Sequence, residues 1–261
     1  MRAMILAAGR GERLRPITDD IPKSLVEVGG KSLLERHLEH VRAAGIRTVV
    51  INLGWLGDKI VERVGSGRRF GLEVVYSQEG DHILETGGGI HKALPTLGDQ
   101  PFLVINADIF TDMPVPGIEL ADEHLGHLVM VPSPDYRNGG DFDIERGLIR
   151  NSDTQSLTFS GVAIYRPQLF AACEAGRFPL APLLRDAAEQ DLAGTLQRVR
   201  EVGFEYVQWS GMPDIPAAEI RSHLDEAGLT AIAGHYPAEP FEEDYGKALN
   251  HWRTIGVTDV A

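Results

Sequence analysis

Short apolar runs alternate with amphipathic stretches along the first two thirds of the chain. An apolar run bounded by glycine or polar residues indicates a buried strand, and apolar positions three or four residues apart indicate a helix. The apolar runs predict strands at Ala3–Ala8, Thr48–Asn52, Glu73–Tyr76, Phe102–Asn106, Leu128–Val131 and Leu157–Tyr165. The amphipathic stretches predict helices at Ser32–Ala44, Leu56–Val64, Thr86–Leu94 and Leu180–Gln190. This alternation predicts an α/β fold with a mostly parallel, Rossmann-like sheet.

Turn residues mark some of the connections. We interpret Gly29-Gly30 as a turn and Ser32 as the N-cap of the helix that follows it. A Gly/Asp-rich stretch, Asp135 to Arg150, predicts a hairpin near Gly147.

The chain changes character from Asp191 onward while it keeps the α/β pattern. The elements predicted there are Leu192–Val202 (helix), Tyr206–Trp209 (strand), Ala217–Ala227 (helix), Thr230–His235 (strand), Phe241–Ile255 (helix) and Val257–Ala261 (strand). We therefore expect two domains, residues 1–190 and 191–261. A short set of strand-helix units leaves sheet edges open, so we expect the second domain to dock on the first, with its strands Tyr206–Trp209 and Thr230–His235 paired in parallel.

Composition narrows the classes of function. The chain has 261 residues, 43% of them hydrophobic, and a formal net charge of −13. Such an acidic chain is unsuited to nucleic acid or to an anionic membrane surface, which favours a small ligand. A single cysteine, Cys173, excludes an intrachain disulfide and a cysteine zinc site. No signal peptide or spanning segment is apparent in the sequence, so the cytoplasm is the expected compartment.

The loop after the first predicted strand contains the clearest ligand signal. Gly9 and Gly11 allow the backbone to turn and to present N–H groups, and cations crowd the same loop. These cations are Arg10, Arg13, Arg15 and Lys23. In an acidic chain this combination indicates a phosphate site, against the alternative of an ordinary basic loop. The loop is not a dinucleotide fingerprint, because Leu14 replaces the third glycine and Pro16 prevents a helix from starting there.

Two further segments have the composition of a binding site. Glu85-Thr-Gly-Gly-Gly-Ile90 opens a helix with three glycines, which leave room for a nucleobase edge or a phosphate beside free backbone N–H groups. A flexible loop is the alternative for this segment. Asp108 follows a buried strand at the edge where open α/β sheets bind ligands, and there it indicates a Mg²⁺ ligand.

Together these segments resemble the sugar-1-phosphate nucleotidyltransferase family over residues 1–190. The residues that fit its long and specific pattern are Leu6-Ala-Ala-Gly9, Gly11, Arg13, Pro16 and Pro22-Lys23. Other stretches resemble the uridylyl branch of the family that acts on N-acetylmuramate 1-phosphate. They are Ile51-Asn52, Trp55-Leu-Gly57, Tyr76-Ser77, Glu79-Gly80, Leu84–Ile90, Gly140-Asp-Phe142, Leu157–Gly161 and Leu180–Leu184.

The resemblance implies a reaction and the residues that support it. A sugar-phosphate oxygen attacks the α-phosphate of UTP in line, and pyrophosphate leaves. The catalytic residues implied are Arg13, Lys23 and Asp108, with Asp108 holding the Mg²⁺ cofactor. The nucleotide-binding residues implied are Ala8, Gly9, Gly11, Arg13, Gly87 and Gly88. The residues implied for the sugar phosphate are Asn106, Asp141, Ser160 and Gly161.

The chain departs from the family after residue 190. The family has a second metal-binding aspartate in a Trp-x-Asp-Val-Gly-Thr-like segment, whereas this chain has Val207-Gln-Trp-Ser-Gly211 with Trp209 at the place of the carboxylate. The substitutes available early in the second domain are Asp191, Glu201, Glu205 and Asp214. Pro179 stands where the family pattern has a basic residue.

Residues 191–261 resemble instead the early part of a sugar-phosphate isomerase/epimerase TIM barrel, which suggests a chimera. The stretches that carry this second resemblance are Leu192–Leu196, Val202–Tyr206, Glu219-Ile-Arg221, Leu224-Asp225, Gly228-Leu229 and His235. Three hypotheses follow: a Mg²⁺-dependent uridylyltransferase, a nucleotide-binding chimera with little turnover because one metal carboxylate is missing, and, remotely, an isomerase-like protein. Three strand-helix units cannot close a barrel, which argues against the last.

Overall fold

The computed structural model of the chain describes residues 1–80, 83–113, 120–121, 124–134, 136–137, 139–145, 147–151, 155–189, 200, 205–210, 216–235, 250–257 and 259–260. It divides into two compact units, Met1–Ala187 and Ala188–Ala261. The domain boundary predicted at 190/191 lies three residues beyond this division.

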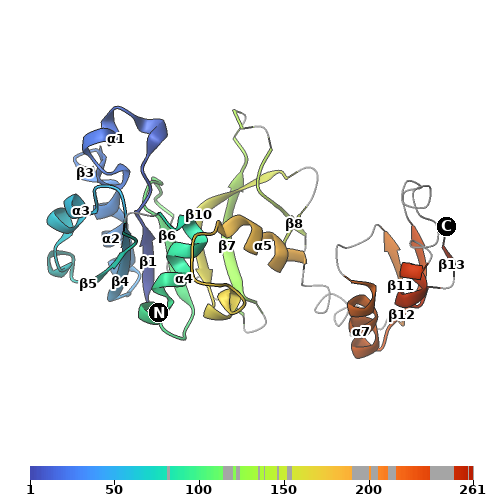
Figure 1. Ribbon diagram of the computed structural model, residues 1–261. Helices are drawn as coiled ribbons and strands as arrows, with labels where there is room; N and C mark the ends of the chain where they lie inside the picture. Colours follow the sequence, from blue (N-terminus) through green and yellow to red (C-terminus); the bar gives the residue numbers. More distant parts are fainter. Residues whose placement is uncertain are drawn as a thin grey trace. The chain divides into compact units, whose positions relative to one another are not determined.

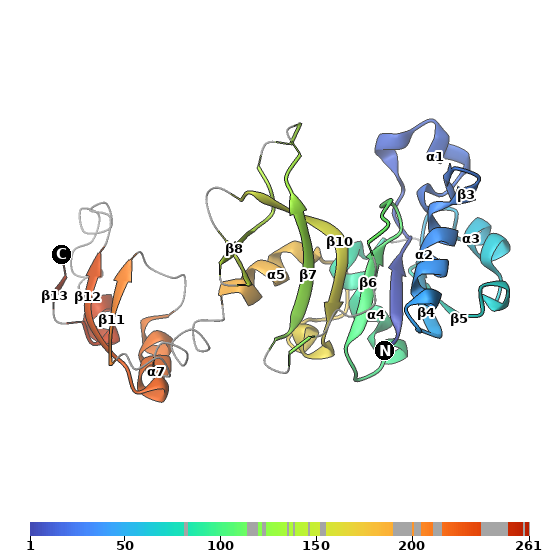
Figure 2. The same cartoon turned by 180° about the vertical axis from the view of Figure 1, so that it is seen from behind.

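A six-stranded sheet forms the centre of the first unit (Figures 1 and 2). Its strands are β1 (Ala3–Leu6), β4 (Thr48–Leu53), β5 (Glu73–Gln78), β6 (Phe102–Asn106), β7 (Gly126–Pro132) and β10 (Leu157–Tyr165). The spatial order is β5-β4-β1-β6-β10-β7. The first four strands in this order are parallel, while β10 runs antiparallel to both β6 and β7. The predicted α/β class with a mostly parallel sheet is therefore confirmed, with an antiparallel pair at one edge.

Helices cover both faces of this sheet. The helices of the first unit are α1 (Ile17–Asp20), α2 (Leu33–Ala43), α3 (Gly57–Val64), α4 (Glu85–Leu97) and α5 (Leu180–Glu189). Alternate residues of a strand point to opposite faces, so the strands feed two separate hydrophobic cores. Ile5 packs with residues of α2 and α3, whereas its neighbour Met4 packs with residues of α4 and α5. The first unit is thus a three-layer α/β/α structure.

Most predicted element positions in this unit are confirmed. β6 and β10 have the predicted bounds, and Ser32 caps α2 in a capping box with Glu35. Gly29-Gly30 joins the short antiparallel strands β2 (Glu27–Val28) and β3 (Lys31–Ser32). The predicted hairpin is formed by β8 (Asp143–Glu145) and β9 (Leu148–Arg150), on either side of Gly147.

Several predicted bounds differ from the structure by one to three residues, among them those of β1 and α4. β1 ends at Leu6 rather than Ala8, because the N–H of Ala7 turns to the Asn52 side chain instead of continuing the strand ladder. α4 continues past Leu94 to Leu97 although Pro95 lies within it.

The described residues of the second unit contain three strands in the order β11-β12-β13, all parallel. They are β11 (Tyr206–Ser210), β12 (Thr230–His235) and β13 (Asp259–Val260), with α7 (Ala217–Ala227) between the first two. The predicted parallel pairing of the strands at 206 and 230 is confirmed. Ile220, Leu224 and Trp252 are at most 1% exposed and form a core of their own. A relation of this unit to TIM barrels stays a prediction.

Among the described residues, no helix combines the length and the apolar character needed to cross a lipid bilayer.

Candidate active site

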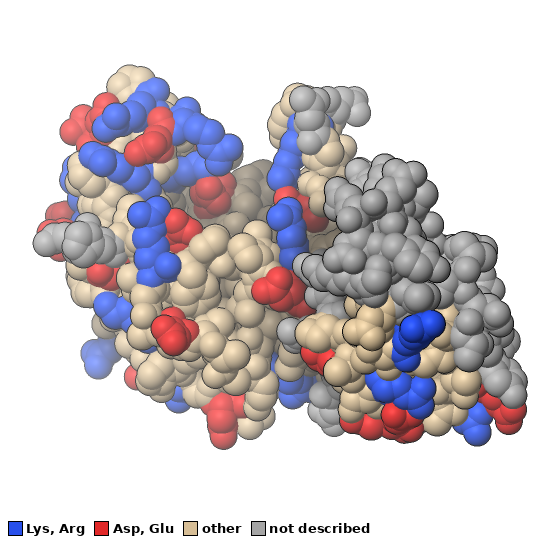
Figure 3. All heavy atoms as spheres, turned by 45° about the vertical axis from the view of Figure 1, so that its right-hand side comes forward, with Lys and Arg blue, Asp and Glu red and all other residues tan. Residues whose placement is uncertain are grey.

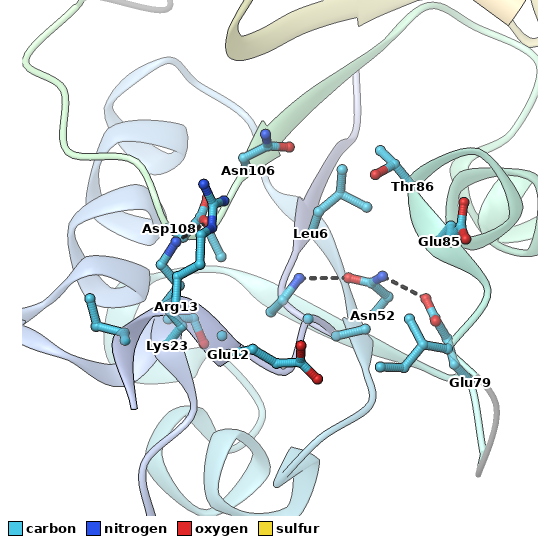
Figure 4. Close-up of a pocket in the computed structure, with 18 residues that line it drawn as sticks. Leu6, Glu12, Arg13, Lys23, Asn52, Glu79, Glu85, Thr86, Asn106 and Asp108 are labelled. Atoms are coloured by element: carbon cyan, nitrogen blue, oxygen red, sulfur yellow. Dashed lines mark hydrogen bonds and ion pairs between the residues drawn. The ribbon is translucent and has the colours of Figure 1, made fainter. Parts of the chain in front are cut away.

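A pocket of about 630 Å³ opens at the carboxyl ends of the central strands of the first unit. Its wall is formed by Leu6, Ala7, Ala8, Gly9, Gly11, Glu12, Arg13, Leu14, Lys23, Ser24, Asn52, Glu79, Ile83, Glu85, Thr86, Asn106, Ala107 and Asp108. Figure 4 shows Arg13, Lys23 and Asp108 on one side of this pocket and Asn52, Glu79 and Thr86 on the other. The pocket therefore brings together the three segments that the sequence singles out for phosphate, nucleobase and metal.

The loop after β1 has a backbone that requires glycine at residue 11. Gly11 has φ +65°, and a Cβ there would lie 2.9 Å from Cγ2 of Thr18 and 3.1 Å from Cβ of Lys23. The buried Thr18 hydroxyl donates to the Gly11 carbonyl oxygen at 2.8 Å. Gly11 thus allows the loop to fold closely against the segment that carries Lys23.

Trp55 supports the same loop from outside the β1 segment. Its backbone N–H donates to the Ala8 carbonyl oxygen at 3.3 Å, and its indole N–H donates to the Thr18 carbonyl oxygen at 3.1 Å. The Arg10 guanidinium lies 4.4 Å from the centre of the indole ring, a cation–π distance. Trp55 therefore links the two ends of the phosphate loop to the start of α3.

Positive charge gathers at this end of an otherwise acidic chain. Figure 3 shows lysine and arginine side chains, mixed with acidic ones, at the top of the first unit, where Figure 1 places α1. Arg13 and Lys23 both line the pocket. A local cationic surface beside exposed N–H groups attracts phosphate even when the net charge of the molecule is negative.

Lys23 and Asp108 form an ion pair inside the pocket. The Lys23 Nζ lies 2.5 Å from Asp108 Oδ2, and the two side chains are 27% and 39% exposed. Asp108 follows β6 directly, so the sheet edge fixes its position. A carboxylate that is partly open to solvent, with a cation on one oxygen, keeps the other oxygen available for a ligand.

His37 of α2 holds the turn that carries Asp108. The His37 Nε2 lies 3.0 Å from the Ile109 carbonyl oxygen, and because a carbonyl only accepts, Nε2 is the protonated donor. Burial lowers the pKa of His37 to about 4, so the ring is neutral at physiological pH. No local pattern predicts this contact, since 72 residues separate the two partners.

Asn52 and Glu79 are pocket residues whose role the sequence did not indicate. Asn52 Nδ2 donates to Glu79 Oε1 at 2.6 Å, and the two side chains lie between β1 and the start of α4 (Figure 4). Both are buried. Both residues lie in stretches that resemble the family, and this resemblance is the signal that could have identified them as site residues.

Gly87 and Gly88 pack closely against the 176–178 segment. A Cβ on Gly87 would lie 2.4 Å from the Phe178 ring, and a Cβ on Gly88 would lie 2.1 Å from the Gly176 carbonyl oxygen. The Gly88 N–H donates to the Phe178 carbonyl oxygen at 3.1 Å. These glycines therefore admit the 176–178 segment, and the residues of this helix start that line the pocket are the preceding Glu85 and Thr86. Their part in binding a base stays a prediction.

The residues predicted for the sugar phosphate lie around one irregularity of β10. The register of β10 against β7 shifts between Phe159 and Ala163. Within this bulge Gly161 has φ +87°, and a Cβ there would lie 2.8–3.0 Å from three atoms of the Asn106 side chain. Asn106 itself lines the pocket, so Gly161 allows it to reach that position.

Asp141 and Ser160 already have partners within the protein. Asp141 pairs with Arg137 at 2.7 Å and accepts from the Phe159 N–H at 2.9 Å. The Ser160 hydroxyl oxygen accepts from the Val162 N–H at 3.3 Å. Neither residue is part of the pocket wall described above, and both shape the bulge next to it.

Of the four predicted substitutes for the second metal carboxylate, the structure describes Glu205. Among the residues that the structure describes, no three His, Cys, Asp or Glu side chains form a cluster suited to a metal ion. Asp191, Glu201 and Asp214 lie outside the described residues, as does the side chain of Trp209. Glu205 is described and pairs with Arg200 at 3.8 Å.

Known proteins share extended sequence similarity with this chain. Residues 2–130 match the family described as nucleotidyl transferase. The chain is 45% identical over 204 residues to N-acetylmuramate alpha-1-phosphate uridylyltransferase of Neisseria meningitidis serogroup B, covering 73% of this chain and 87% of that protein. It is 35% identical over 202 residues to the protein of the same name from Caulobacter vibrioides, covering 71% and 84%.

A solved structure extends the likeness to three dimensions. The crystal structure of HddC from Yersinia pseudotuberculosis, complexed with GMP-PN, is 26% identical with a TM-score of 0.58, covering 69% of this chain and 83% of that chain. The chain therefore belongs to the nucleotidyl transferase family.

Proposed function

We propose that the protein transfers a uridylyl group from UTP to N-acetylmuramate α-1-phosphate and releases pyrophosphate. The observation that carries the proposal is the Lys23–Asp108 pair at the end of a phosphate loop, in one pocket. The names of the two relatives with 45% and 35% identity support the choice of base and sugar.

The reaction needs positioning and charge neutralisation more than covalent chemistry. An oxygen of the sugar phosphate attacks the α-phosphorus of UTP, and the bond from that phosphorus to the oxygen bridging to the β-phosphate breaks. In the proposal the amides of Gly9 and Gly11, with Arg13, hold the triphosphate. Lys23 lies against the phosphate that reacts and offsets the negative charge that gathers there.

The donor set at Asp108 suits Mg²⁺. Magnesium is usually held by one or two carboxylates, with the remaining ligands from substrate phosphates and water. Asp108 supplies one carboxylate, and its solvent-exposed fraction of 39% leaves room for such ligands. When bound, Mg²⁺ supplies charge neutralisation on the phosphates. In the proposal Asp108 would hold this cation, and the ammonium group of Lys23 would bind the phosphates.

The base and the sugar occupy opposite ends of the pocket in this proposal. The base lies between Ala8 and the Glu85-Thr86 segment, both on the wall. The sugar phosphate lies on the side of Asn106, next to the β10 bulge that Asp141, Ser160 and Gly161 form.

Release of pyrophosphate, measured with a panel of nucleoside triphosphates and sugar 1-phosphates, tests the proposal. We expect the fastest release with UTP and N-acetylmuramate α-1-phosphate, and a larger thermal shift with UTP or dTTP than with ATP or GTP. Faster turnover with a purine nucleotide would overturn the base, and faster turnover with another sugar would overturn the sugar. Binding of UTP without turnover would favour the nucleotide-binding alternative.

A further inference from the structure

Asn52 and Glu79 form a buried chain of hydrogen bonds between two walls of the pocket. Asn52 Oδ1 accepts from the Ala7 N–H at 2.7 Å, and Asn52 Nδ2 donates to Glu79 Oε1 at 2.6 Å. The other carboxylate oxygen, Glu79 Oε2, accepts from the Leu84 N–H at 2.8 Å. The chain thus connects the end of β1 to the residue before α4, as the dashed lines in Figure 4 show in part.

A buried carboxylate is costly unless its oxygens receive hydrogen bonds. Glu79 is 7% exposed and Asn52 is 3% exposed, and each oxygen of Glu79 has its own N–H donor. Backbone N–H groups donate at both ends of this row of hydrogen bonds, so the two side chains between them must accept at their outer atoms. Between the two side chains, one must donate and the other must accept. Such an arrangement is satisfied with one amide and one carboxylate, but not with two amides or two carboxylates.

Gly89 makes room for this chain. A Cβ on Gly89 would lie 2.7 Å from Glu79 Oε1 and 3.1 Å from Asn52 Nδ2. The third glycine of the Thr-Gly-Gly-Gly segment therefore lets α4 pack directly against the Asn52–Glu79 pair. The Asn52–Glu79 pair, Gly89 and the two backbone donors come from four separate segments of the protein and are in contact with one another.

We propose that Asn52 and Glu79 are positioning residues that set the spacing of the nucleobase slot. Ala7 precedes Ala8, and Leu84 precedes Glu85, so each end of the hydrogen-bonded chain adjoins one wall of that slot. The inference rests on the proposed function, which puts a base between these walls. We expect the pair to affect binding of the base and not of the phosphates, because Gly9, Gly11 and Lys23 take no part in this row of hydrogen bonds.

Two single substitutions and their combination test the polarity of the chain. Glu79→Gln places an NH₂ group against one of its two N–H donors, and Asn52→Asp places two carboxylates in contact. Each leaves a buried group unpaired, so we expect UTP binding about tenfold weaker in each. In the double variant N52D/E79Q the introduced carboxylate accepts from Ala7 and from the introduced amide, whose oxygen accepts from Leu84. Binding should return to within about threefold of the parent protein.

The readouts separate this role from a general loss of structure. UTP binding is measured by titration calorimetry, with inorganic tripolyphosphate as a second probe that lacks the base. Tripolyphosphate should bind the parent and all three variants alike. Glu73→Gln is the matched control, because Glu73 is an exposed carboxylate on β5, the strand that ends just before Glu79, and it accepts from the Thr48 hydroxyl at 3.1 Å. It should leave both affinities unchanged.

Several outcomes would overturn the inference. These are single variants that bind UTP as the parent does, a double variant no better than the weaker single one, and an equal loss of tripolyphosphate binding. If the single variants do not fold, a folded double variant with restored binding supports the proposal. Gly89→Ala, which removes no polar group, should also weaken the binding of UTP and leave the binding of tripolyphosphate unchanged. If the parent binds another triphosphate instead of UTP, the proposed base is wrong, and the same series is then measured with that nucleotide.

Discussion

Lys23 and Asp108 are separated by 85 residues in the sequence and by 2.5 Å in the pocket. Each sits at the end of a different local structure, Lys23 after the phosphate loop and Asp108 after β6. At the scale of single residues, the activity proposed above depends on this proximity more than on any other contact.

Removing the charge of Asp108 tests its assignment to the metal. Asp108→Asn keeps the size of the side chain and loses the anionic ligand, so Mg²⁺-dependent turnover should fall by about a hundredfold or more. The thermal unfolding temperature should change little. Asp99→Asn, at an exposed turn beyond α4, is the control. Turnover of the Asp108 variant within about threefold of the parent would remove Asp108 from the metal site.

Substitution of Gly161 tests the link between the β10 bulge and the pocket. Gly161→Ala adds a Cβ that meets the Asn106 side chain and disfavours φ +87°. We expect unfolding free energy to fall by about 1–3 kcal/mol and the Michaelis constant for the sugar phosphate to rise. Gly45→Ala is a matched control, since Gly45 has φ +81° and open space around its Cβ position. Only the Gly161 variant should change the Michaelis constant.

At the scale of elements, α2 is tied to α3 and to the residues that follow it through Glu35. The Glu35 carboxylate completes the capping box with Ser32 and pairs with Arg63 at 3.0 Å and with Arg69 at 2.8 Å. Hydrogen bonding from Arg63 is the main cause that lowers the pKa of Glu35 to about 2. α2 also carries His37, so its placement bears on the Asp108 turn.

Glu35→Gln should therefore destabilise the first unit in a pH-dependent way. The folded pKa lies below the unfolded value of 4.5, so the ionised carboxylate stabilises the fold fully above pH 4.5. We expect a loss of about 1–3 kcal/mol in unfolding free energy at pH 7, which shrinks as pH falls from 4.5 toward 2. Urea unfolding across this range measures it. Glu39→Gln, an exposed position on the same helix, should change the value by less than about 0.5 kcal/mol.

The elements were predictable where their signals are local. β6 and β10 follow from apolar runs, and the start of α2 follows from Ser32 and Glu35 within one turn of chain. The phosphate loop and Asp108 also stand out locally, by glycine, charge and position after a strand. These parts of the fold and of the pocket could be read from the sequence.

Contacts between distant segments could not be read in the same way. The packing of Gly87 against Phe178 was not predicted, because Phe178 lies 91 residues further along the chain and nothing near Gly87 indicates this contact. Asn52 and Glu79 look like ordinary polar residues at strand ends until the sheet brings them to 2.6 Å. The pairing of parallel β4 and β5 is what creates that contact.

At the scale of the whole molecule, the two units have separate hydrophobic cores. A ligand that binds one folded unit raises the stability of that unit by mass action. Scanning calorimetry should therefore show two transitions, of which UTP raises only the one that belongs to the first unit.

A substitution at Ile220 identifies the unfolding transition of the second unit. Ile220 is fully buried in the core of the second unit, so Ile220→Ala should cost about 2–5 kcal/mol there. It should lower one transition and leave the UTP-sensitive transition in place. A single transition in the parent that moves as a whole with UTP and with Ile220→Ala would show that the two units unfold together.

The central place of β1 has a consequence for how the site moves. β1 is bonded on both sides, to β4 and to β6, so its amides exchange with solvent only when the sheet opens. The glycine loop begins within three residues of its end. Solvent exchange should therefore change from the slowest to the fastest rates in the molecule over that short stretch. Nucleotide binding should therefore order the glycine loop while β1 stays as it is. Slower hydrogen exchange at the amides of Gly9 and Gly11 would measure this ordering directly.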